Sequence, residues 1–233
     1  MGVPDTSDIR GTGGYGDKRK GSRPLVGAAV AATILYVAST VMLGTPPGAA
    51  DSGAQVAAWF REHRDSVRWA VWALTVIAPL LALVFALLRR LLPVPHRDVF
   101  LIGSIAFLVT TAVQAWTWGG LALHADQLEP ATARTLLDVA VFWGPVLTGA
   151  TVTMMAPVTL LALRGHAGLP KWLGAVGAVA ITEQAIETVT IFGSTGFTEP
   201  GGAMNLQLGA GLVAAWLLAF AVWGGVRGQS VIA

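Results

Sequence analysis

The sequence predicts an all-α membrane protein, a bundle of six transmembrane helices with both termini in the cytoplasm. Composition is the first reason, because 54% of the 233 residues are hydrophobic and 12% are charged, whereas a soluble domain carries about 25% charged residues. The second reason is the presence of six apolar segments, each long enough to cross a hydrocarbon core of about 30 Å. The third is the uneven distribution of basic residues between alternate connecting segments.

The chain divides into an N-terminal tail, a transmembrane domain and a C-terminal tail, at residues 1–23, 24–227 and 228–233. The N-terminal tail is polar, glycine-rich and basic, which is typical of a disordered cytosolic segment. The first apolar segment is longer than the roughly 7–15 residues of a signal-peptide core, so we expect an uncleaved helix. The six spans are expected at residues 24–44, 67–88, 98–124, 138–163, 171–193 and 203–226.

The orientation follows from the positive-inside rule. With the N-terminus inside, the cytoplasmic segments hold eleven Lys and Arg residues and the outer segments hold four. The outer four are Arg61, Arg64, Arg68 and Arg134. We therefore predict a multi-pass protein of the inner (plasma) membrane, surrounded by lipid.

The segment between the first two spans is predicted to contain a short helix. Ser52 and Gln55 have the spacing of a capping box, and Trp59 and Phe60 follow. Because amphipathic helices with aromatic residues favour the headgroup region, we expect this helix to lie on the outer membrane interface. Pro130 suits the first turn of an outer extension of the fourth span.

Two acids in the fifth span are the most informative feature for function. Glu183 and Glu187 are separated by four residues, so they share one helical face with Thr190 beside them. An acid at this depth is costly unless it faces the bundle interior, and it is a functional candidate by default. Hydrogen bonding between helices is the structural alternative. Burial and a neighbouring like charge both favour the neutral form, so at least one acid is expected to be protonated at neutral pH.

Other spans place polar and aromatic residues at a similar depth, in the outer half of the membrane. This shared depth predicts an aromatic-lined pocket that opens to the outer leaflet or the outer side, with Glu183 and Glu187 as catalytic residues. The expected substrate-binding residues are Gln114, Trp118, Asp138, Trp143, Thr148, Asn205 and Trp216.

Several function classes are excluded or disfavoured. The chain has no cysteine, which excludes disulfides, thiolate chemistry and cysteine-bound metals. Its four histidines lie near expected span ends without an i,i+4 pair, and no phosphate-binding glycine motif is present. We therefore expect no metal and no cofactor. The net charge is +2, and the basic residues follow membrane topology rather than a nucleic-acid surface.

Three stretches carry a resemblance to a known group of proteins. They are Gly44-Thr45-Pro46-Pro47 followed by Trp59-Phe60 and His63-Arg64, then Gly168-Leu169-Pro170-Lys171-Trp172-Leu173-Gly174, and Pro200-Gly201-Gly202-Ala203-Met204-Asn205. Together they resemble a broad group of uncharacterised small actinobacterial six-helix membrane proteins. The resemblance covers most of the chain after residue 24 and implies the six-helix fold and an actinobacterial origin. It implies no activity.

The residues favour an enzyme that acts on a lipophilic, isoprenoid-like substrate by general-acid catalysis. Glu183 or Glu187 supplies the proton, and Trp118 and Trp143 shield the positive charge that develops. The logic of such a site is similar to that of membrane terpene cyclases. The absence of Asp-rich diphosphate-binding motifs disfavours reactions that begin by ionising a prenyl diphosphate.

Two alternatives remain open at this stage. The first is a proton-coupled carrier or lipid-handling protein, although the inner halves of the spans are uniformly apolar. The second is an accessory subunit of a larger membrane complex, which would need a protein partner.

Overall fold

The computed structural model describes residues 23–227. Within this range the chain is helical and contains no strand, which confirms the predicted all-α class. The tails expected at residues 1–23 and 228–233 lie outside the described residues, apart from Arg23 at the start of α1.

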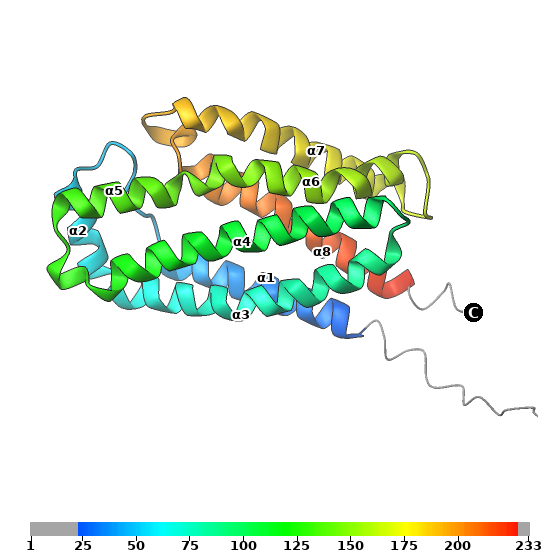
Figure 1. Cartoon of the computed structure of the whole chain (residues 1–233), viewed down its shortest axis with the longest axis horizontal. Coiled ribbons are helices and arrows are strands. Elements are labelled where there is room, and N and C mark those ends of the chain that lie inside the picture. Colours follow the sequence, from blue (N-terminus) through cyan, green and yellow to red (C-terminus); the bar gives the residue numbers. More distant parts are fainter. Residues whose placement is uncertain (1–22, 228–233) are drawn as a thin grey trace, which may run out of the picture.

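Eight α-helices and five shorter turns of helix make up the described chain (Figure 1). The α-helices are Arg23–Leu43 (α1), Gly53–Glu62 (α2), Arg64–Leu88 (α3), His96–Leu123 (α4), Pro130–Val141 (α5), Trp143–Leu163 (α6), Lys171–Glu187 (α7) and Ala210–Arg227 (α8). The 3₁₀ turns are Arg89–Leu91, Ala125–Gln127, Thr188–Phe192 and Gly196–Thr198, and Met204–Gly209 is a π-helix.

Six helical stretches are long and apolar enough to cross a membrane. They are Pro24–Leu43, Arg64–Leu91, His96–Leu123, Pro130–Leu163, Lys171–Phe192 and Met204–Arg227. Large hydrophobic side chains such as Val41, Ile102 and Trp116 remain exposed along them, as lipid-facing surfaces require. These features are those of a multi-pass membrane protein. The identity of the membrane and the inward orientation of both termini stay predictions.

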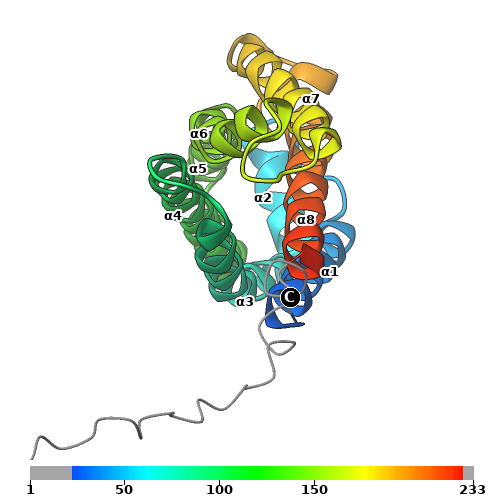
Figure 2. The same cartoon turned by 90° about the vertical axis from the view of Figure 1, so that its right-hand side faces the viewer.

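The six spans form a ring that closes on itself. Around the ring α1 contacts α3, α3 contacts α4, and α4 contacts α6. Helix α6 contacts α7, α7 contacts α8, and α8 returns to α1, an order that can be followed in the view along the bundle (Figure 2). Residues distant in sequence therefore face one another across the interior.

Three of the spans are less regular than the sequence predicts. The fourth is interrupted at Phe142, because Pro145 has no N–H to bond the carbonyl of Val141 and the helix ladder breaks there. The fifth was expected as one helix to residue 193, but α7 ends at Glu187 and continues as a 3₁₀ turn. The sixth begins with a π-helix, a form that occurs frequently at functional sites.

The basic end of the bundle is the end that carries Arg89, Arg97, Arg164, Lys171 and Arg227. The half next to it is filled by a dry aromatic and aliphatic cluster. Its rings meet edge to face, with centroids of Phe85 and Phe100 at 6.0 Å and of Phe100 and Phe220 at 6.2 Å, a favoured geometry for aromatic pairs. We call this region the dry half.

The opposite, loop end is the end that carries residues 44–63, 124–130 and 188–203. The predicted capping box is present, since Gln55 N donates to Ser52 Oγ at 3.3 Å and Ser52 N donates to Gln55 Oε1 at 2.7 Å. Helix α2 packs on α5 and buries Val56, Ala57 and Phe60. Its position on the outer interface stays a prediction. Pro130 occupies the first turn of α5, as expected.

Side chains from distant segments hold the connections of the loop end together. Arg134 Nη1 donates to the carbonyl of Gly48 at 2.8 Å and to that of Asp51 at 3.2 Å. The Glu199 carboxylate accepts the N–H of Ala49 at 2.9 Å. The turn after α1 is thus fixed to α5 and to the segment before α8, and these three segments form the rim of the site described next.

Candidate functional site

Two adjoining chambers lie inside the ring, on the side of the loop end. The large chamber has a volume of about 450 Å³ and is lined by the end of α1, parts of α3 and α4, and the loops around Pro46 and Glu199. The small chamber measures about 120 Å³, lies deeper, and is lined by all six spans. Five residues line both chambers, which places the chambers side by side: Tyr36, Leu74, Gln114, Trp143 and Ala210.

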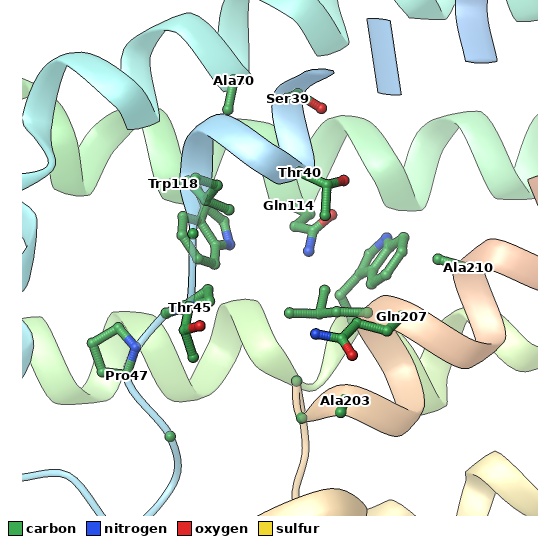
Figure 3. A pocket seen from close by; sticks show the side chains of 18 of the residues that line it. Ser39, Thr40, Thr45, Pro47, Ala70, Gln114, Trp118, Ala203, Gln207 and Ala210 are labelled. Carbon is green, nitrogen blue, oxygen red and sulfur yellow. The ribbon is translucent and has the colours of Figure 1, made fainter. Parts of the chain in front are cut away.

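Side chains from several elements line the large chamber (Figure 3). Gln114 and Trp118 both come from α4, and Gln207 approaches from the π-helix on the opposite side. Thr40 and Thr45 add hydroxyl groups from the end of α1 and the turn after it. The chamber is thus largely apolar, with a few polar groups that converge on one space, which is the usual character of a small-molecule site.

A hydrogen-bonded network lies beside the small chamber, with Glu187 at its centre. Asn205 Nδ2 donates to Glu187 Oε1 at 2.5 Å, and Gln184 Nε2 donates to Glu187 Oε2. Gln184 Nε2 also donates to Glu183 Oε2 at 3.1 Å. Both oxygens of Glu187 therefore accept a hydrogen bond, and one amide group joins the two carboxylates.

Neighbouring groups fix the orientation of the two amides. Thr151 Oγ1 on α6 donates to Gln184 Oε1 at 2.5 Å. The backbone N–H of Gly201 donates to Asn205 Oδ1 at 2.9 Å. With their oxygens occupied in this way, both amides turn their N–H groups toward the carboxylates. The network spans α6, α7 and the start of the sixth span.

Two glycines make room for this network. A Cβ at Gly209 would collide with Oε2 of Glu187 and lie 2.9 Å from Gln184 Nε2. A Cβ at Gly144 would lie 2.7 Å from Cγ of Asn205. Any larger residue at either position must displace a member of the network.

Among the described residues three buried indole N–H groups have no hydrogen-bond partner: that of Trp216 in the dry half, and two at the large chamber. The latter two belong to Trp118 and Trp143, both of which line the large chamber. A buried donor without an acceptor is costly, and Trp118 is only 7% exposed. An acceptor oxygen on a molecule in the chamber would satisfy it.

The structure brings five of the nine predicted site residues to the chamber walls. Glu187 and Asn205 line the small chamber, Trp118 lines the large one, and Gln114 and Trp143 line both. Their roles in binding or catalysis stay predictions.

The other four predicted residues line neither chamber. Glu183 is buried behind Gln184, with Oε1 unpartnered, and Thr148 is buried in α6. Asp138 forms an ion pair with Arg134 and is about half exposed. Trp216 is fully buried in the dry half, 5.7 Å from the ring of Phe220. Trp216 therefore packs among the residues of the dry half, a position that helical spacing alone did not distinguish from pocket lining.

Several residues of the site were not predicted. Gln184 lies between the two acids in sequence, and its i,i+3 relation to Glu187 was a signal for its role. Tyr36 is the one tyrosine of the first span, and its hydroxyl donates to the carbonyl of Leu206 at 3.3 Å. Glu199 reaches the large chamber from a loop and Gln207 from the π-helix, and no local sequence pattern predicts either position.

In residues 23–227, no three His, Asp or Glu side chains lie close enough together to hold a metal ion. No family model, curated protein or solved structure matches the chain. The resemblance to small actinobacterial membrane proteins therefore stays a prediction, and the functional argument depends on the geometry of the site.

Proposed function

We propose that this membrane protein is an enzyme that protonates a lipophilic, isoprenoid-like molecule held in the two chambers, with Glu187 as the proton donor. The observation that carries the proposal is the position of Glu187, which lines the small chamber while that chamber adjoins a large, mainly apolar one. The large chamber falls within the roughly 300–1,000 Å³ of small-molecule sites.

The surroundings of Glu187 suit a residue that gives up a proton. When the proton leaves, negative charge develops on the carboxylate, and the N–H groups of Gln184 and Asn205 already point at its two oxygens. Donors arranged in advance around a developing charge lower the barrier to its formation. Thr151 and Gly201 hold these donors in place. Glu187 is favoured over Glu183 because only Glu187 lines a chamber.

The chemistry balances without an oxidant, a reductant or a cofactor. The π electrons of an alkene form a new C–H bond with the proton from Glu187, which leaves a carbocation on the ligand and a carboxylate on the protein. Loss of a proton from a neighbouring carbon to the carboxylate restores the acid and gives an isomerised or cyclised alkene. The ring faces of Trp143 and Tyr36, which line both chambers, suit the intermediate positive charge.

The dry half weighs against a proton-coupled carrier. A carrier needs access to its site from both sides of the membrane. Here Phe85, Phe100 and Phe220 fill the bundle between the small chamber and the basic end. Both chambers are therefore reached from the loop end or from the lipid beside it.

Deuterium incorporation tests the proposal directly. The purified protein in lipid nanodiscs is incubated in deuterium oxide with geraniol or farnesol, and the extracted alcohols are analysed by mass spectrometry. Each cycle of protonation and deprotonation places deuterium on carbon. We expect incorporation by the wild type and a fall of about 100-fold or more in Glu187→Gln, as for loss of a general acid. Glu62→Gln on the exposed surface of α2 is the matched control and retains the wild-type rate.

Three outcomes would count against the proposal. Equal incorporation by the wild type and Glu187→Gln would remove Glu187 as the donor. Binding of the alcohols without any incorporation would make the protein a lipid-binding protein. If neither alcohol binds, the accessory-subunit alternative takes precedence.

A further inference from the structure

The ionisable side chains that line the two chambers are acidic and not basic. The chain contains 15 Lys and Arg residues and four His residues, yet none of those in the described range lines either chamber. Each chamber does contain an acid in its wall, Glu199 in the large one and Glu187 in the small one. The walls therefore carry only negative or neutral groups.

The guanidinium of Arg134, a cation that holds the rim together, is already engaged. It bonds the carbonyls of Gly48 and Asp51 and pairs with Asp138. Glu183 and Glu187 form no ion pair in the described part of the chain, and their shared partner is the neutral amide of Gln184. A ligand in the chambers would meet carboxylates without a compensating cation.

This arrangement disfavours a negatively charged ligand. Charges interact more strongly away from bulk water, so an anion is repelled at short range by Glu199, and by Glu187 once it has given up its proton. A buried anion also needs a paired cation or several donors, and the donors in the large chamber are neutral groups such as the indoles of Trp118 and Trp143 and the amides of Gln114 and Gln207. A phosphate or diphosphate has no partner of opposite charge in these walls.

The same arrangement favours positive charge on the ligand. Trp143 and Tyr36 line both chambers, and aromatic ring faces attract cations. Once it has given up its proton, the carboxylate of Glu187 keeps a donor on each oxygen and completes an ion pair with such a ligand.

We propose that the two chambers select their ligand by positive charge, so that the substrate class is a neutral lipophile that becomes cationic when bound, and anionic prenyl phosphates are excluded. This inference rests on the proposed function, because the cation it describes is the one formed when Glu187 transfers its proton. A stable lipophilic ammonium therefore mimics the state after proton transfer. Glu199 at the rim contributes to entry, and Glu187 contributes to selection.

Three probes with one hydrocarbon chain test the inference: geranyl-dimethylamine, geraniol and geranyl phosphate. Each is titrated into the protein in nanodiscs of zwitterionic lipid, and binding is followed by native mass spectrometry, with empty nanodiscs as the blank. We expect the amine, which is an ammonium at neutral pH, to bind about tenfold or more tightly than the alcohol, since an ion pair and a cation–π contact add together. The phosphate is expected not to bind.

Variants separate the contribution of Glu187 from nonspecific binding of the amine. In Glu187→Gln the affinity for the amine falls to that for geraniol, while the affinity for geraniol stays within about threefold of wild type, which also shows that the chamber is intact. Glu62→Gln keeps the wild-type preference. Glu199→Gln slows association of the amine and preserves the ratio of affinities.

The possible failures are distinct. If no probe binds above the blank, the proposed function fails together with the inference. If geraniol binds but the amine binds no tighter, or if geranyl phosphate binds as well as the amine, charge selection is overturned and the lipophilic chamber stands. If the preference survives in Glu187→Gln and is lost in Glu199→Gln, the assignment of selection to Glu187 is wrong.

Discussion

Between the basic end and the bundle centre, the spans enclose aromatic rings in edge contact. Between the centre and the loop end, the same spans enclose two chambers and a chain of amides and carboxylates. The dry half contains uninterrupted α-helix, as in the parts of α6 and α8 next to the basic end. The chambered half contains the break at Phe142, the 3₁₀ turn after Glu187 and the π-helix from Met204.

This difference teaches that close packing and the candidate site occupy separate parts of the bundle. In lipid, helices associate through close packing because the solvent is as apolar as the side chains. Phe85, Phe100 and Phe220 supply that packing in the dry half. In the chambered half, Gly144 and Gly209 leave space that polar groups occupy. Substitutions in the dry half should therefore mainly lower the stability of the protein, whereas substitutions in the chambered half should mainly change ligand binding or the reaction rate.

The largest effect is expected from Phe220→Ala. Phe220 is fully buried and contacts both Phe100 and Trp216, so truncation leaves a cavity that costs about 3 kcal/mol. Unfolding of the purified protein in mixed micelles, titrated with a denaturing detergent, measures this cost. The affinity for geraniol is expected to stay near wild type. Phe192→Ala is the control, because that side chain is 89% exposed. Equal destabilisation by both variants would contradict the assignment of packing to the dry half.

An intermediate effect, on binding as well as stability, is expected from Gly209→Ala. The added methyl group collides with the Glu187 carboxylate and must displace it, and overpacking of this kind costs roughly 1–3 kcal/mol. We expect the preference for the amine over geraniol to fall by about tenfold. Gly211→Ala is a matched control two residues further along, where a methyl group meets nothing within 4 Å. If the two variants bind the probes alike, the carboxylate is not where ligand selection occurs.

The smallest effect is expected from Thr151→Val, which removes the hydroxyl that donates to Gln184 Oε1. Hydrogen bonds between membrane helices contribute about 0.6 kcal/mol on average, so stability should fall by that order. Without this bond the Gln184 amide is free to rotate, and deuterium incorporation is expected to slow severalfold. The comparison variant is Thr153→Val, whose exposed hydroxyl bonds only the carbonyl of Gly149 within its own helix. If deuterium incorporation also slows in Thr153→Val, the effect comes from a change in helix α6 itself and not from the loss of the hydrogen bond to Gln184.

Length and hydropathy were sufficient to predict the fold class, because a lipid-exposed chain must satisfy its backbone hydrogen bonds within each span. The capping box at Ser52 and Pro130 at the start of α5 were also predictable, since both are local effects of neighbouring residues. The spacing of Glu183 and Glu187 predicted a polar face toward the interior, because an acid in a span cannot face lipid cheaply, and both side chains are buried.

Packing of the helices around the ring decided the rest. It placed Trp118 and Trp143 on a chamber wall and Trp216 in the dry half, although helical spacing treated all three alike. It also joined Asn205 to Glu187 across 18 residues and Glu199 to Ala49 across 150. Depth along a span can be read from one helix, because the rise per residue is constant. Which neighbour a side chain meets depends on how all six helices are rotated against one another, and no local pattern of residues specifies that.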